Sequence, residues 1–434
     1  MNCERILAAL VSTLIFAGSA AAADIDGDRL YRLTTMWRGD SLPLTSVGAS
    51  VPENRIVLAP DAGSRAQQWQ FIPMGLDLYR IVTLADGVEK SLDIVNDGRN
   101  NDRPTLAATG NYSGQFWKAT LQTNGFYRLS TSWRGEGFSL DVLNDGVNTR
   151  LALTETGEFS GQYWRLTPTG DAPGLGRSLV DRPDEIAGSQ IKLIYVIPKD
   201  GIDNLYDLRR NIAYQVKVAD RWAQEQVQRS FRYDTYKGAL DITFVRLAVT
   251  AAELKAAALR ANPNASQVTA YAELRALGFD SSDKLYVLYY DGSNFSGTCQ
   301  SFGGGQVTTL VLKEGAPDAP IASLKSCSYM PLQSADGPFR RSNQESTVAS
   351  TMVHEFFHSV GMVPSCAVNV KGGGNMHLAP ISSDIMAFDG TGHTTYSLDT
   401  PRTQYYGHGR TDCPDLADSG IWADAPLDAP LTPP

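Results

Sequence analysis

The sequence has no long basic run, no long apolar run after its first residues, and few cysteines and histidines, and each of these shortages excludes a class of protein or site. It has no long basic run: 38 Lys and Arg stand against 47 Asp and Glu, a formal charge of -9 over 434 residues. An acidic chain of this kind binds nucleic acid poorly, so we expect no nucleic-acid partner. After the first 23 residues, no stretch reaches ~18 uninterrupted apolar residues, so we expect no membrane span.

The first 23 residues are interpreted as a signal peptide. Arg5 supplies a positive charge, Ile6 to Gly18 is apolar but too short to span a bilayer, and Ala21 to Ala23 fits the small-residue cleavage rule. A membrane anchor is the alternative. The interpretation predicts an exported protein, extracellular or periplasmic, that begins at Asp24.

Cysteine is also scarce, with five in the chain. Cys3 leaves with the signal peptide, and Cys299, Cys327, Cys366 and Cys413 remain. An even number in an oxidising compartment predicts disulfides, and proximity along the chain favours Cys299–Cys327 and Cys366–Cys413. A cysteine metal site is the rival interpretation, but no CxxC pair is present.

The N-terminal part of the chain repeats itself three times. Tyr-Arg pairs recur at residues 31, 79 and 127, and each copy closes on Gln-x-Trp, at residues 67–69, 115–117 and 162–164. A repeat of about 48 residues is one supersecondary unit. Short apolar runs between Asn-Gly and Asp-Gly turns predict β units that share one core.

These repeats resemble the ricin B-type β-trefoil lectins over residues 28–168. The resemblance implies carbohydrate binding, with sugar hydroxyls bound by an Asp that maps to Asp93 and Asp141. We place Pro43 at the equivalent position of the first copy, which implies that this copy does not bind. Tyr112 and Phe159 are candidates for the aromatic residue that packs against a sugar ring. The alternative is that both aspartates only brace a turn.

A change of pattern separates the two halves of the chain. Residues 169–188 are rich in Pro and Gly and are interpreted as a linker. Beyond it, strands are expected at 191–197, 241–249, 284–290 and 306–312, with helices around 212–223 and at 251–261. The alternation predicts an α+β or α/β sheet domain over 189–424. The last ten residues, 425–434, contain four prolines and are expected to be disordered.

Histidine is scarce as well, and all five lie between residues 354 and 408. A capping box at Ser342–Glu345 predicts a helix that ends at Gly361. That helix carries His354-Glu355-Phe356-Phe357-His358, an HExxH motif. Residues i and i+4 of a helix lie one above the other, so both imidazoles can bind one zinc ion, with Glu355 beside it as general base.

Residues 195–412 resemble a group of secreted bacterial metzincin-like peptidases, which implies a zincin-like fold. Metzincins place a third zinc ligand six residues after the second histidine, where this chain has Pro364. His377 is therefore the preferred third ligand and Asp384 the alternative; Asp384 could instead support another ligand. Ser383 to Met386 resembles a Met-turn. The tyrosine that often follows it is replaced by Phe388, so Tyr405, Tyr406 or His408 are candidates to stabilise the transition state.

Together these patterns predict a secreted zinc endopeptidase with an N-terminal carbohydrate-binding β-trefoil, acting on proteins or glycoproteins. The competing interpretation is a secreted lectin-like binding protein whose zinc domain is inactive or structural. Another zinc hydrolase, such as a deacetylase, is a third possibility, but a helical HExxH favours peptide bonds.

Overall fold

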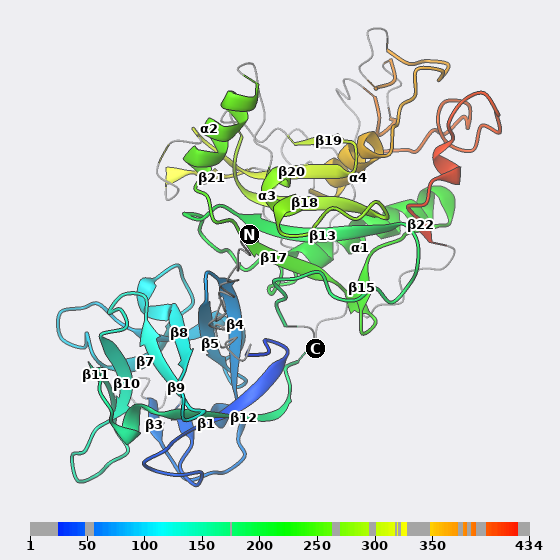
Figure 1. Ribbon diagram of the computed structural model, residues 1–434. Coiled ribbons are helices and arrows are strands. Elements are labelled where there is room, and N and C mark those ends of the chain that lie inside the picture. Colours follow the sequence, from blue (N-terminus) through cyan, green and yellow to red (C-terminus); the bar gives the residue numbers. More distant parts are fainter. Residues whose placement is uncertain are drawn as a thin grey trace, which may run out of the picture.

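The computed structural model describes most of the chain in two domains (Figure 1). The described residues are 25–47, 56–173, 176–262, 270–294, 301–316, 319, 323–327, 348–371, 376–379, 383–387 and 396–423. The predicted signal peptide, the capping box at 342–345, Cys299, Phe388 and the tail at 425–434 lie outside them.

The N-terminal domain is a β-trefoil, because it consists of a six-stranded closed barrel and three two-stranded hairpins. Around the barrel lie β1 (Arg29–Thr35), β12 (Trp164–Asp171), β9 (Tyr127–Thr131), β8 (Trp117–Leu121), β5 (Leu78–Thr83) and β4 (Trp69–Gly75). The hairpins are β2 (Leu44–Ser46) with β3 (Ile56–Leu58), β6 (Lys90–Ile94) with β7 (Pro104–Ala108), and β10 (Phe138–Val142) with β11 (Leu151–Glu155). Strand β12 runs to Asp171, past residue 168, because Asp171 pairs with Arg29 to close the barrel.

The three Gln-x-Trp tryptophans make the threefold repeat visible in the core. Trp69, Trp117 and Trp164 are all fully buried. Each indole N–H donates to the backbone oxygen of a leucine in the hairpin of its own repeat at 2.8 Å, and those leucines are Leu44, Leu92 and Leu140. A buried indole N–H needs such a partner, so the motif fixes hairpin and barrel against each other.

The C-terminal domain is built on one mixed sheet with the strand order β17-β13-β18-β20-β19. Strands β17 (Ile242–Arg246), β13 (Gln190–Ile197), β18 (Lys284–Ser293) and β20 (Val307–Glu314) are parallel. Strands β19 (Phe302–Gly304) and β21 (Lys325–Ser326) pair antiparallel with β20. The predicted strands at 191–197, 284–290 and 306–312 are confirmed, and the one at 241–249 is shorter.

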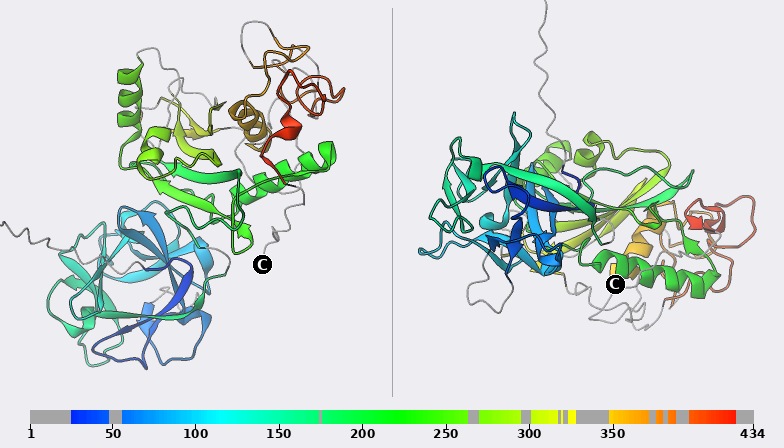
Figure 2. Two further views of the ribbon diagram at one scale, coloured as in Figure 1. Left: turned by 45° about the vertical axis from the view of Figure 1, so that its right-hand side comes forward. Right: turned by 90° about the horizontal axis from the view of Figure 1, so that it is seen from below.

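Helices cover both faces of this sheet (Figures 1 and 2). Helices α1 (Asn211–Val227) and α4 (Val348–Ser359) share a core with one face. Helices α2 (Ala251–Ala261) and α3 (Tyr271–Ala276) pack on the other. Two small pairs complete the domain: β14 (Ser230–Phe231) with β22 (Trp422–Ala423), and β15 (Thr235–Tyr236) with β16 (Ala239–Leu240). The helices expected around 212–223 and at 251–261 are confirmed.

The segment that joins the domains packs against the C-terminal sheet. Ser178 lies beside edge strand β17, and its carbonyl accepts the Phe244 N–H at 2.8 Å. The Arg177 side chain is fully buried and pairs with Asp203 and Asp207. A buried guanidinium needs such paired carboxylates, so part of the segment predicted as a linker is fixed in place.

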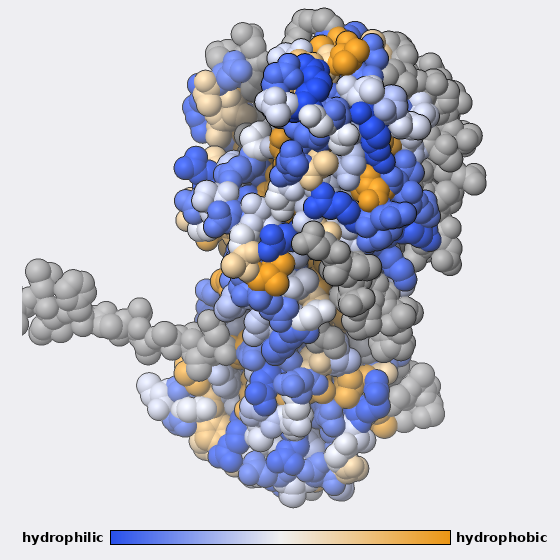
Figure 3. All heavy atoms as spheres, turned by 90° about the vertical axis from the view of Figure 1, so that its right-hand side faces the viewer, coloured by the Kyte–Doolittle hydropathy of each residue, from blue (hydrophilic) through white to orange (hydrophobic). Residues whose placement is uncertain are grey.

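Direct contacts also join the two domains. Arg246 of β17 donates from Nε to the carbonyl of Met74 in β4 at 3.0 Å. At the surface, Arg209 pairs with Glu89 at 3.1 Å. The face drawn in Figure 3 is mainly hydrophilic, with apolar side chains scattered over it. Among the described residues, none of the helices has the length and apolarity needed to cross a membrane.

Candidate metal centre and carbohydrate sites

Helix α4 carries the HExxH motif on a well-anchored scaffold. Its buried side includes Met352, Phe356 and Phe357, each 0% exposed in the core beneath the sheet. The helix ends at Ser359, and Gly361 has φ +84°, a left-handed conformation that favours glycine. The C-terminal end of the predicted helix is thus confirmed, and its core side fixes the direction of the histidine side.

Three histidine nitrogens converge at the centre of this site. The Nε2 atoms of His354, His358 and His377 lie 3.2 Å from one another in all three pairs. These histidines form one of the two clusters in the described residues that could hold a metal ion. The structure therefore brings His377, the preferred third ligand, to the HExxH pair.

The other ring nitrogen defines the tautomer of two of these histidines. His354 Nδ1 lies 2.7 Å from the Ile385 carbonyl, and His358 Nδ1 lies 2.8 Å from the Met362 carbonyl. A carbonyl cannot donate, so each Nδ1 carries the hydrogen and each Nε2 presents a lone pair. Two lone pairs that face each other at 3.2 Å do not form a hydrogen bond with each other, and both are available to one shared metal ion.

The histidine cluster fits zinc. Nitrogen ligands at about 2.0–2.1 Å in tetrahedral geometry lie about 3.3 Å apart, close to the separation found here. Burial lowers the pKa of His358 to about 4, so this ring is neutral and free to coordinate at ordinary pH. The arrangement can therefore hold one divalent ion through three imidazole nitrogens.

Glu355 is the acidic group of the motif. Burial raises the pKa of Glu355 from 4.5 to about 7, and a hydrogen bond from the Gly303 backbone N–H opposes that rise. A carboxyl group that titrates near 7 is matched to accepting and returning a proton at neutral pH. The contact with Gly303 could not be predicted from the sequence, because no local pattern relates a glycine run to a helix some fifty residues later.

Asp384 and Tyr405 bond each other in the protein interior, and neither has the role at the histidine cluster that the sequence suggested. Asp384 is 4% exposed; its carboxylate accepts the Met386 N–H at 2.8 Å and the Tyr405 hydroxyl at 2.8 Å. Tyr405 is fully buried, so its hydroxyl is not available to a substrate. Asp384 is not part of the metal cluster; it holds the turn whose Ile385 carbonyl orients His354. The expectations of Asp384 as ligand and Tyr405 as catalytic group are thus corrected.

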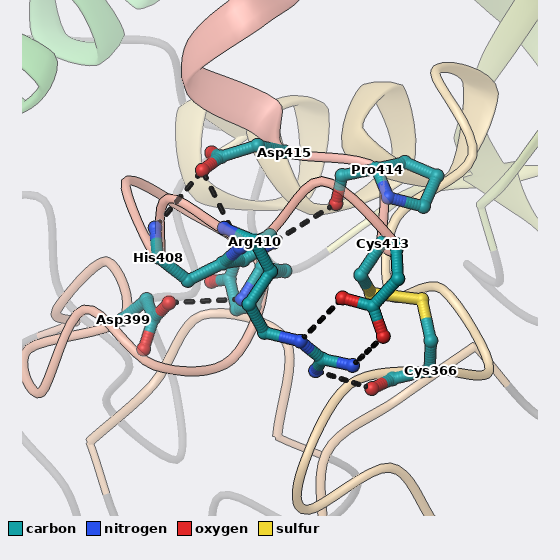
Figure 4. Close-up of a disulfide and its surroundings, with 9 residues drawn as sticks. Cys366, Asp399, His408, Arg410, Cys413, Pro414 and Asp415 are labelled. Atoms are coloured by element: carbon teal, nitrogen blue, oxygen red, sulfur yellow. Dashed lines mark hydrogen bonds and ion pairs between the residues drawn. A yellow bond between two sulfur atoms is a disulfide. The ribbon is translucent and has the colours of Figure 1, made fainter.

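His408 belongs to the loop drawn in Figure 4. Its Nδ1 accepts the Arg410 N–H at 3.1 Å, and its Nε2 donates to the Pro414 carbonyl at 3.1 Å. Asp415 caps the same loop by accepting the His408 N–H at 2.9 Å. Both ring nitrogens are engaged with backbone groups, so the expectation of a catalytic His408 is corrected to a role in holding this loop.

The disulfide prediction is confirmed where it can be followed. Cys366 and Cys413 form a disulfide with Cα atoms 5.7 Å apart, and it ties the segment after α4 to the His408 loop (Figure 4). Cys327 is buried and disulfide-bonded. Its predicted partner, Cys299, lies outside the described residues.

The second acidic cluster is not a metal site. Asp181, Asp234 and Asp241 meet in the C-terminal domain, but two lysines lie among them. The fully buried Lys192 is 2.8 Å from Asp181, and Lys284 is 2.7 Å from Asp181 and 3.0 Å from Asp234. Together with Arg182, which lies 2.7 Å from Asp241, these two ammonium groups neutralise the three carboxylates, so the cluster is a structural ion-pair network.

The three trefoil repeats differ in the hairpin residue that contacts the glutamine of Gln-x-Trp. In each repeat the Gln of Gln-x-Trp donates from Nε2 to the hairpin: Gln67 to Thr45 at 3.0 Å, Gln115 to Asp93 at 3.1 Å, and Gln162 to Asp141 at 3.2 Å. The residue equivalent to the two aspartates is thus Thr45, not Pro43, since Leu44 binds Trp69 as Leu92 binds Trp117. Only the second and third repeats have a carboxylate there.

The same two repeats carry an exposed aromatic side chain. Tyr112 is 62% and Phe159 is 58% exposed, while the first repeat has Ser64 at this place. A Cβ on Gly161 would lie 2.3 Å from the Asp141 carboxylate, so the turn before each glutamine lies directly on the aspartate. Asp93 is only 6% exposed, and burial raises its pKa.

Comparison with known proteins finds solved structures that are similar to about a third of this chain. No family model matches the chain, and no curated protein matches it either. Among solved structures, it is similar to the designed threefold-symmetric protein ThreeFoil, with 22% identity over 32% of this chain and 96% of ThreeFoil, and a TM-score of 0.28.

Two natural trefoil structures are similar to the same extent. The BEL β-trefoil has 16% identity over 34% of this chain and 96% of its own, with a TM-score of 0.28. A lectin of Polyporus squamosus has 15% identity over 33% of this chain and 50% of its own, with a TM-score of 0.27. At these scores the likenesses carry no argument, so the trefoil assignment depends on the strand topology.

Proposed function

We propose that the protein is a secreted zinc-dependent endopeptidase of the metzincin-like kind, with an N-terminal trefoil of the ricin B type that binds carbohydrate. The observation that carries the enzymatic part is the convergence of three histidine Nε2 atoms, 3.2 Å apart, with the partly buried Glu355 next to His354 on the same helix. The trefoil part is supported by the carboxylate and the exposed aromatic that recur in two repeats.

His354, His358 and His377 would hold the zinc ion. Zinc at such a site supplies a Lewis acid that polarises a carbonyl group and makes a water molecule more acidic. The Ile385 and Met362 carbonyls orient His354 and His358, because each accepts a hydrogen bond from the remote ring nitrogen.

Glu355 acts as the general base and acid. It takes a proton from a water molecule as the water attacks the scissile carbonyl, and it delivers a proton to the amine that leaves. In the metal-free protein, burial raises the pKa of Glu355 to about 7. This pKa would be lower beside a bound zinc ion, which favours the carboxylate form that accepts the proton.

Strand β19 offers a place for an extended peptide. It lies at the end of the sheet, pairs on one side with β20, and packs against α4, which carries Glu355. Extended peptides bind to such strand edges through their backbone groups. The Gly303 N–H of this strand already bonds the Glu355 carboxylate, so a peptide bound at the edge would lie close to the carboxyl group proposed as the base. This closeness supports peptide bonds as the target.

The second candidate is a secreted lectin-like binding protein with a structural zinc site. It is favoured by the burial of Tyr405 and by the backbone contacts of His408, since neither can assist Glu355. The two candidates agree on metal binding and differ on turnover.

A measurement of zinc and proteolysis in the same preparations tests the proposal. The wild type should hold about one zinc per chain and cleave members of a peptide library, and a chelator should abolish cleavage until zinc is returned. A wild type that holds zinc and cleaves nothing would favour the binding protein. A wild type without zinc would contradict both candidates.

Carbohydrate binding is tested separately on a glycan array. Asp141→Ala and Asp93→Ala should each weaken binding by about 1.5–3 kcal/mol, the cost of losing a hydrogen bond to a charged group. Thr45→Ala is the matched control, because Thr45 occupies the same position in the repeat without a carboxylate. Normal binding by both aspartate variants would leave the trefoil as a spacer or a protein-binding module.

A further inference from the structure

The hairpin β19–β20 touches α4 more closely than side chains normally allow. A Cβ on Gly303 would lie 1.8 Å from the Glu355 carbonyl oxygen and 3.0 Å from Ser359 Oγ, so only glycine fits there. Gly304 and Val307 are paired, and Gly305, with φ +61°, begins the two-residue turn between them. The glycine run is therefore an ordered strand pressed onto the helix.

Ser359 holds this hairpin through a fully used hydroxyl group. Its Oγ accepts the Gly304 N–H at 3.1 Å and donates to the Val307 carbonyl at 2.9 Å. The Glu355 carbonyl lies 3.3 Å from the same Oγ and is a second, longer acceptor for its hydrogen, and the Thr308 hydroxyl lies 2.9 Å away. A serine hydroxyl has one hydrogen and two lone pairs, so these four contacts engage all of it.

Ser359 and Glu355 are four residues apart and lie on one side of α4. The strand that Ser359 fixes through Gly304 is the strand whose Gly303 N–H bonds the Glu355 carboxylate. Ser359 also follows His358 directly in the chain. Ser359 and Glu355 therefore lie on the same side of α4, and both bond strand β19.

We propose that Ser359 is a positioning residue: it clamps the Gly303–Gly304 strand onto α4 and thereby holds the carboxylate of Glu355 in its working orientation. This inference rests on the proposed function for its catalytic consequence only. The clamp itself is a property of the metal-free chain and can be measured without turnover.

The first test is hydrogen exchange at the Gly303 and Gly304 amides of the full chain. Ser359→Ala removes the acceptor for Gly304, so its exchange should become about 2- to 10-fold faster, which corresponds to a hydrogen bond of about 0.5–1.5 kcal/mol. Ser359→Thr keeps the hydroxyl and should restore slow exchange. Unchanged exchange in Ser359→Ala would overturn the clamp whether or not the protein binds zinc.

The second test separates positioning from a merely structural role. Ser359→Ala should keep about one zinc per chain and lower kcat about tenfold or more, with KM within about twofold. Ser178→Ala is the matched control, because it deletes another serine hydroxyl, bonded to Val180, away from α4. Faster exchange with wild-type kcat would overturn the positioning role. A wild type without zinc or turnover would contradict the proposed function alone, since the exchange result stands by itself.

Discussion

Replacement of Glu355 by glutamine should remove activity and increase stability in the same protein. Glutamine keeps the shape of glutamate and an oxygen that can accept the Gly303 N–H, so the contacts of α4 should survive. It cannot take up a proton, and the loss of a general base costs about 10²- to 10⁴-fold in rate. Zinc content should stay at that of the wild type, because Glu355 is not one of the three ligands.

The gain in stability follows from the burial of the carboxyl group. In metal-free protein, burial raises the pKa of Glu355 from 4.5 to about 7, and each pKa unit is worth about 1.4 kcal/mol. The folded state thus holds the proton more tightly, so the wild type loses stability as the pH rises from about 4.5 to about 7. For a fully buried carboxyl group, the wild type would lose about 3 kcal/mol of unfolding free energy over this pH range. The side chain of Glu355 is in partial contact with solvent, which reduces the expected loss to about 2 kcal/mol.

Urea unfolding of chelator-treated protein at about pH 4.5 and about pH 8 measures this effect. The glutamine variant should match the wild type at the lower pH and exceed it by about 2 kcal/mol at the higher one. Glu225→Gln on the exposed part of α1 is the control and should change neither activity nor stability. Peptidase activity within about tenfold of the wild type would refute Glu355 as the base. If the wild type and the glutamine variant were equally stable at both pH values, burial of the Glu355 carboxylate would carry no cost in stability.

Three further results are expected. His377→Ala should lose zinc, measured by atomic absorption, while Asp384→Asn should weaken zinc affinity by no more than about 10- to 100-fold; the reverse order would contradict the ligand set. Tyr405→Phe should lower the unfolding free energy by about 1.5–3 kcal/mol at about pH 8 and by about 0.5–1.5 kcal/mol at about pH 5. Burial raises the pKa of Asp384 to about 6, and the hydroxyl bonds the neutral carboxyl group at the lower pH more weakly than the carboxylate. Removal of Cys366 and Cys413 together opens a loop of 47 residues and should cost about 4 kcal/mol in urea unfolding; an unchanged midpoint would argue against the chain-entropy account.

Local patterns predicted most of the elements. Residues 193–197 are uniformly apolar and form most of β13, a strand buried on both faces, which is the pattern of a central strand covered by helices. The predicted strand begins at residue 191, and Lys192 within it is buried because it pairs with Asp181. The Gln-x-Trp repeats predicted the trefoil, since each tryptophan bonds the hairpin of its own repeat. The predicted position of Pro43 was wrong, because the first hairpin is aligned by the Trp69 bond to Leu44, which places Thr45 opposite Gln67.

The HExxH pair followed from sequence for a simple reason. Helical geometry fixes residues i and i+4 on one side of α4, whatever surrounds them. The third histidine had no such rule, and His377 and Asp384 were both chemically acceptable. Packing separated them: the chain after α4 brings His377 Nε2 within 3.2 Å of His354, while Asp384 turns away to Met386 and Tyr405.

The sequence alone predicted the helix that carries His354, Glu355 and His358, the threefold trefoil, and the strands of the C-terminal sheet, because these depend on neighbours a few residues apart or on an internal repeat. Only the packing of the chain brought His377 to the histidine pair, buried Tyr405, and placed Gly303 against Glu355. Those contacts join segments far apart in the chain, and their geometry is set by how the sheet, α4 and the disulfide-linked loops pack, which no local pattern of residues encodes.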